Sequence, residues 1–187
     1  MSRGKSTGAY AELGIGPKLL EMLRGMAPKV TRVAVLVNPS NLSHAALLKN
    51  VHAAAPTLGV KVQTVEASTS QAIANGFTAM ARQNAGALIV SLDQFFIQQR
   101  KQIAELAAKQ RLPSISAFGE YVEAGGLMSY GARIIEMVRR AASYADKIFK
   151  GANPGDKFEL AVNLKTAKAL CIKVSQSILI QATKVIE

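Results

Sequence analysis

Apolar positions along this chain alternate between short unbroken runs and longer stretches with helical spacing. Residues 33–37 are all apolar, which is typical of a strand covered on both faces. Apolar side chains then recur at helical spacing over residues 47–58, where Pro56 should end or kink the helix near Ala55. This stretch therefore predicts one strand followed by one helix.

The same alternation continues to about residue 117. It predicts further strands over residues 60–67, 87–90 and 113–117, and helices over residues 16–26, 73–81 and 96–111, the second of these capped by Ser68 or Thr69. Strands separated by helices of this length pair in parallel through right-handed crossovers. The predicted fold class is therefore α/β, an open, doubly wound parallel sheet with helices on both faces.

The last third of the chain has a different pattern. Two glycines at 125–126 precede a short extended piece over residues 127–130, and one long helix is expected over 134–150. A strand over residues 158–162 and short helices from about Lys165 and Gln176 close the sequence. The sequence therefore predicts a C-terminal helix-strand-helix segment in addition to the parallel sheet.

Composition narrows the class of protein. With 187 residues, 49% of them hydrophobic and 19% charged, the chain should be globular. The formal net charge of +11 is compatible with nucleic-acid binding, but the cations are scattered and no aromatic residues alternate with them, so a solvated basic face is the better interpretation. One cysteine and two histidines, His44 and His52, predict neither a disulfide nor a metal site.

No apolar run reaches the length of a membrane span, and residues 1–18 lack the continuous apolar region of an export signal. On this basis, the chain as it stands would be cytoplasmic.

The loops that follow the predicted strands are the candidate ligand sites, because open parallel sheets bind ligands beyond the carboxyl ends of their strands. These loops cover residues 38–43, 91–94 and 116–121. Short polar side chains there could hold a carboxylate or an amide, and Asp93 could take a cation. The alternative is that Asn38, Ser40 and Ser43 are only turn and cap residues, and the sequence leaves both interpretations open.

Catalytic and phosphate-binding motifs are not supported. Residues 4–7, Gly-Lys-Ser-Thr, copy the end of a P-loop but lack its first glycine and its preceding strand. No G-x-S-x-G motif is present, and Glu120 and Glu123 are expected on an exposed helical turn rather than as a catalytic pair. We therefore expect no enzyme and no cofactor.

Several segments in order resemble the solute-binding proteins of ABC transporters, in particular the tryptophan/tyrosine-type family. They are PKLLEMLRGMAPKVTRVAVLVNPSN, AGALIVSLDQ, IAELAAKQRLPSI, FGEYVEAGGLMSYG, RRAASYADKIFKGANP and FELAVNLKTAKAL with a terminal KVIE. VEAGGLMSYG and FELAVNLKTAKAL are fairly specific, and the order spans nearly the whole chain.

The resemblance implies a periplasmic-binding-protein fold, in which two α/β lobes close on a small molecule and present it to a membrane permease without catalysing a reaction. The ligand would be an amino acid or a related small polar solute, and the protein would be periplasmic. The ligand-binding positions that it implies are Asn38, Ser40, Asn41, Ser43, Asp93 and Gln94, with Phe118 and Tyr130 near the cleft or hinge.

The resemblance divides the chain into three regions, and each region departs from the family pattern in some way. Residues 1–15 would be a remnant of the first crossover, 16–124 the ligand-binding lobe, and 125–187 the hinge and a segment that normally packs on a first lobe absent here. Its last strand would then lack its usual sheet. Cys171 stands where the family has a helix-ending glycine, and Phe118 stands where amino-acid-binding relatives often have Asp.

A second hypothesis is a freestanding α/β interaction domain. An apolar surface left uncovered by the absent lobe would favour self-association, as a homo-oligomer, or a protein partner.

Overall fold

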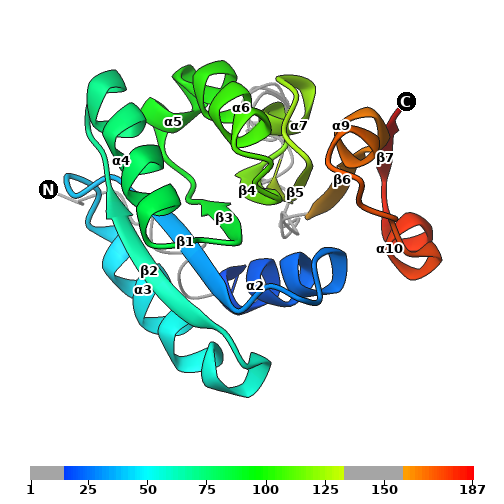
Figure 1. The fold of residues 1–187 in the computed structure, drawn as a ribbon, viewed down its shortest axis with the longest axis horizontal. Helices are drawn as coiled ribbons and strands as arrows, with labels where there is room; N and C mark the ends of the chain where they lie inside the picture. The colour runs from blue at the N-terminus through cyan, green and yellow to red at the C-terminus, as the bar shows by residue number, and fades with distance from the viewer. Residues whose placement is uncertain (1–14, 133–157) are drawn as a thin grey trace, which may run out of the picture.

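The computed structural model describes residues 15–132 and 158–187, whose strands form one seven-stranded sheet in the order β2-β1-β3-β4-β5-β6-β7 (Figure 1). The strands are β1 (Arg32–Val37), β2 (Lys61–Glu66), β3 (Ala87–Val90), β4 (Ser114–Phe118), β5 (Met128–Ala132), β6 (Glu159–Asn163) and β7 (Lys184–Ile186). The pairs from β2 through β5 are parallel. The predicted α/β class with an open parallel sheet is confirmed.

Helices cover both faces of this sheet. They are α2 (Ile15–Met26), α3 (Ser43–Ala54), the 3-10 turn η1 (Pro56–Leu58), α4 (Ser70–Arg82), α5 (Gln94–Gln98), α6 (Arg100–Lys109), α7 (Glu120–Glu123), α9 (Leu164–Ala169) and α10 (Gln176–Gln181). One buried cluster joins α2, α3, α9 and α10 to the sheet, and the other joins α4, α5, α6 and α7 to its opposite face. Within the described ranges, no helix has the length and apolar character that crossing a membrane requires.

Strand β1 shows why its sequence is an unbroken apolar run. Val33, Val35 and Val37 belong to the buried cluster on one face, and Ala34 and Leu36 belong to the cluster on the other. A central strand with helices on both sides buries every side chain in turn, so alternation with polar residues disappears. The five buried positions of β1 are thus a direct consequence of its place between β2 and β3.

The helix after β1 ends where the sequence predicts. The α-helix stops at Ala54, the chain tightens into η1 at Pro56, and Gly59 takes a left-handed conformation with φ 64°. The next helix begins at the predicted cap, because the Thr69 hydroxyl accepts a hydrogen bond from the Ala72 N–H at 3.1 Å.

The strands of the C-terminal segment join the same sheet, a pairing that the sequence analysis did not predict. Strand β6 pairs antiparallel with β5, and β7 pairs parallel with β6 at the sheet edge. In Figure 1 the orange and red elements of this segment lie at the end of the molecule away from α3 and α4. The long helix expected over residues 134–150 lies outside the described residues.

Two further expectations are corrected. The helix expected over residues 96–111 is divided into α5 and α6, because Gln99 leaves the helical region (φ −89°, ψ 10°). Glu120 is buried, with 7% exposure, since α7 packs against β5 and β6, whereas Glu123 is exposed as expected.

The glycine pair after α7 is required by geometry. Gly125 has φ 101°, a conformation that L side chains rarely adopt, and a Cβ on Gly126 would lie 2.2 Å from the Tyr121 ring. The chain therefore turns tightly beneath a fully buried tyrosine before it enters β5.

Tyr121 makes the free energy of unfolding depend on pH in the alkaline range. Burial raises the pKa of its phenol well above the ordinary value, against the opposing effect of its 2.8 Å hydrogen bond with Ser114. Because the folded-state pKa is raised, this contribution is fully present below about pH 10 and is lost as the pH rises further. Tyr121→Phe should remove about 1.4 kcal/mol per pH unit from the alkaline slope of the unfolding free energy, measured by urea titration above pH 10. Equal slopes in both proteins would contradict this account.

Cys171 follows α9 in a left-handed conformation, φ 56°, at the position where the family resemblance places a helix-ending glycine. A side chain in this conformation costs about 1 kcal/mol. Cys171→Gly should therefore raise the free energy of unfolding by roughly 0.5–1 kcal/mol in urea denaturation, after the entropy of the unfolded glycine is counted. Cys171→Ala keeps the Cβ and is the matched control, and an equal gain in both variants would refute the conformational explanation.

Candidate functional site

The loops after β1 and β3 meet at one edge of the sheet. The two strands pair in parallel, with Leu36 opposite Val90, so residues 38–43 and 91–93 leave the sheet side by side. Between them lies an open hollow of about 420 Å³, and the residues that line it are Asn38, Ser40, Asn41, Leu42, Ser43 and Asp93. Five of the predicted ligand residues are thus brought together at one place.

Asp93 joins the two loops through its carboxylate. The Asn38 side-chain amide donates to its Oδ1 at 3.2 Å, and the Asn41 side-chain amide donates to its Oδ2 at 2.8 Å. Oδ1 also accepts a hydrogen bond from the Phe95 N–H at 2.9 Å, which caps α5. Three neutral donors thus satisfy the carboxylate of Asp93, a residue with 8% exposure that has no cationic partner among the described residues.

The two asparagines also form turns. Asn38 Oδ1 accepts from the Ser40 N–H at 3.1 Å, and Asn41 Oδ1 accepts from the Ser43 N–H at 3.1 Å and its hydroxyl at 2.7 Å. These bonds hold each amide oxygen in a turn of the loop after β1, while each amide nitrogen donates to Asp93. Asn38, Ser40 and Ser43 therefore take part in turns, and the same residues line the hollow.

The His44 side chain connects the main chains of the same two loops. It lies in the first turn of α3 at 4% exposure, and its Nδ1 is 2.9 Å from the Asn38 N–H nitrogen while its Nε2 is 3.1 Å from the Leu92 carbonyl oxygen. The ring is also stacked parallel to Phe96, with centroids 6.5 Å apart.

The sequence analysis considered the two histidines as metal ligands and missed this role. The helical spacing of His44, Leu47 and Val51, all buried, was the available signal that His44 faces inward, whereas His52 is exposed. Leu42, at the rim of the hollow and 92% exposed, was also missed.

The remaining predicted residues lie apart from the hollow lining. Gln94 is exposed at the start of α5, next to Asp93. Phe118 is fully buried, edge-on to Tyr121 at 6.0 Å, and Tyr130 is half-buried and stacked on Phe158 at 5.5 Å. The packing of β4 against α7 thus places the Phe118 ring in the core rather than at a cleft.

The chemistry of the hollow follows from its lining. Asp93 supplies a charged group, while the other lining residues supply amides, hydroxyls and one apolar side chain. This arrangement favours a ligand that brings hydrogen-bond donors or a positive charge, in a chain whose formal net charge is +11. Across residues 15–132 and 158–187, no group of three or more His, Cys, Asp or Glu side chains is arranged to hold a metal ion.

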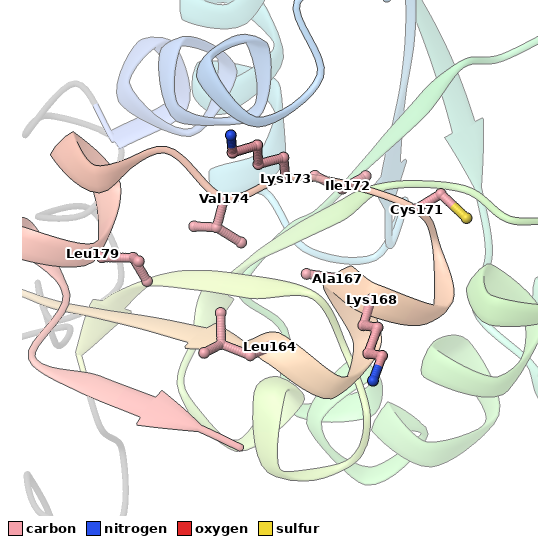
Figure 2. Close-up of a pocket in the computed structure, with 8 residues that line it drawn as sticks. All are labelled: Leu164, Ala167, Lys168, Cys171, Ile172, Lys173, Val174 and Leu179. Atoms are coloured by element: carbon pink, nitrogen blue, oxygen red, sulfur yellow. The ribbon is translucent and has the colours of Figure 1, made fainter.

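A second hollow, of about 430 Å³, lies between α9 and α10 (Figure 2). Leu164, Val174 and Leu179 contribute apolar side chains to it, and the ammonium groups of Lys168 and Lys173 point in opposite directions. Because its polar groups do not converge, it offers less to a specific small molecule than the hollow at Asp93.

An open, mostly parallel sheet with a polar hollow at its strand ends is the architecture of one lobe of a periplasmic binding protein. A model of the family described as ABC transporter substrate binding protein matches residues 7–186. The chain belongs to this family, which consists of binding proteins and not of enzymes.

Known proteins similar to this chain are longer than it is. A tyrosine-binding protein of Clostridioides difficile is 22% identical over 160 residues, which are 82% of this chain and 46% of that protein. A solved structure from Streptococcus pneumonia, an ABC domain in complex with L-Trp, has a TM-score of 0.78 at 22% identity and covers 91% of this chain. A conserved domain protein from Vibrio cholerae has a TM-score of 0.77 at 21% identity, with the same coverage. This chain spans 60% of each of these two structures, and at such identities the likeness shows the fold alone.

Asp93 should contribute more to stability than an ordinary helix cap. Asp93→Ala removes the cap of α5 and also leaves the amides of Asn38 and Asn41 without their shared acceptor, so we expect a loss of about 2–3 kcal/mol in the free energy of unfolding. Thr69→Ala is the matched control, because it removes a helix cap at a residue that does not line the hollow and should cost about 1 kcal/mol. Equal losses in urea denaturation would show that Asp93 acts as a cap and not as a link between loops.

Proposed function

We propose that this chain is the second-lobe portion of a solute-binding protein of an ABC uptake system, holding a small solute between the hollow at Asp93 and a first lobe. The observation that carries the proposal is that two loops, separated in sequence but adjacent in the sheet, line one open polar hollow. Family membership supports it, because substrate binding is the role by which the family is described.

The ligand that fits best is an amino acid or a related small polar solute with a cationic or donor-bearing group. Asp93 provides the matching charge, and Asn38 and Asn41 hold that carboxylate in place before any solute arrives. The names of two relatives, a tyrosine-binding protein and a domain in complex with L-Trp, support an amino acid.

Affinity in this proposal depends on closure. A one-sided hollow leaves a bound solute in contact with water, whereas a second lobe would enclose it and shift the hinge equilibrium toward the closed state. Leu42, exposed at the rim, would then contact the solute or the first lobe. A membrane permease and a periplasmic location complete the proposal, since family members usually act outside the cytoplasm.

The test joins this chain to the first lobe of the Streptococcus L-Trp-binding relative and screens amino acids, amides and small carboxylates by thermal shift. A solute present at a hundredfold excess over its Kd should stabilise the lobe pair by about 2.7 kcal/mol. Asn41→Ala should weaken that stabilisation, because it frees one Asp93 oxygen from its partner. The matched control is Gln71→Ala, which removes an exposed amide on α4 that does not line the hollow and should leave the stabilisation unchanged.

A second function is favoured by one observation. Ile180 on α10 is 78% exposed and β7 lies at the edge of the sheet, which together suit association with another chain. If no solute stabilises the lobe pair while this chain alone sediments as a dimer, an interaction domain replaces the solute-binding proposal.

A further inference from the structure

We propose that His44 is a positioning residue of the hollow, whose ring fixes the distance between the loops after β1 and β3. The effect on solute binding rests on the function proposed above, but the link that His44 makes between the two loops does not. His44 is not one of the residues that line the hollow, and it acts through the main chain of Asn38 and Leu92.

Both ring nitrogens lie within hydrogen-bond distance of the main chain of the two loops. Nδ1 lies 2.9 Å from the backbone nitrogen of Asn38 and 3.1 Å from its carbonyl oxygen, and Nε2 lies 3.1 Å from the carbonyl oxygen of Leu92. The imidazole with its proton on Nε2 is the form that accepts from the Asn38 N–H and donates to the Leu92 carbonyl at the same time.

His44 can set the distance between the two loops because its partners lie where the loops begin. Asn38 is the first residue after β1, and Leu92 directly precedes Asp93. The ring thus spans the bases of the two loops whose side chains meet at the Asp93 carboxylate, where the Asn41 bond is 2.8 Å long. A shift of Asn38 or Leu92 would lengthen the hydrogen bonds from the asparagine amides to Asp93.

The ring itself is held in place. It is nearly fully buried, and its face is parallel to Phe96 on α5, so the same contact connects α3 with the helix that Asp93 caps. His52, two turns further along α3, is exposed, so it is a suitable control on the same helix.

A purely structural role makes a different prediction. If His44 only fills space against Phe96, then a phenylalanine would fill it as well and the Asn38 amide would keep its protection. If the ring acts through its nitrogens, then each hydrogen bond should be lost or retained separately, according to which nitrogen the replacement reproduces.

Three variants of the 187-residue chain separate these cases by amide hydrogen exchange without any ligand. His44→Phe keeps the stacked ring and loses both bonds, and the Asn38 N–H should exchange roughly tenfold faster. His44→Asn places an amide oxygen near the Nδ1 position, so protection of Asn38 should return. His44→Gln reaches the Nε2 position alone, so Asn38 should stay unprotected. His52→Phe should change nothing at Asn38.

Full protection of Asn38 in His44→Phe, or failure of His44→Asn to restore it while the chain stays folded, would overturn the proposal. In the lobe pair with L-tryptophan as the probe, the Kd should rise about tenfold in His44→Phe and return toward the parent value in His44→Asn. Absence of L-tryptophan binding in the parent pair would count against the proposed ligand, whereas the exchange experiment would still decide the role of His44.

Discussion

Parallel pairing of β1 with β3 is the constraint on which the hollow depends. Because both strands run in the same direction, their carboxyl ends leave the sheet at one edge, and the loops that follow them must share that space. The unbroken apolar run of β1 is needed for this arrangement, since both of its faces are covered by helices. The hollow is therefore a consequence of how the core is packed, and its polar lining is set by the few residues after each strand.

Those few residues hold a carboxylate among neutral donors. Asn38, Asn41 and the Phe95 N–H satisfy Asp93 from three directions, and His44 joins the bases of the same loops. Side chains fixed in this way lose little freedom when a solute arrives, which is what a binding site without catalysis requires. The chain spans about half of one curated relative and 60% of two related structures.

Local patterns made much of this fold predictable. The first strand and its helix were predicted because an apolar run, Pro56 and Gly59 mark them within a few residues. The break at Gln99 has no proline or glycine to announce it, and the burial of Glu120 depends on the long-range packing of α7 against β5 and β6. The antiparallel pairing of β6 with β5 was missed for the same reason, because the sequence of a strand does not specify which distant strand it pairs with.

The site was predictable to the extent that loop positions follow from strand order. Asn38, Asn41 and Asp93 were expected near one another, and they are. Phe118 was expected near the cleft from a family resemblance, but its surroundings are set by Tyr121 and the core. The most direct test of the account is a crystal structure of this chain joined to a first lobe, with a stabilising solute bound. The account predicts that the donor-bearing group of the solute lies within hydrogen-bond distance of Asp93 or Asn41. A solute held by the first lobe alone, or elsewhere on this chain, would contradict it.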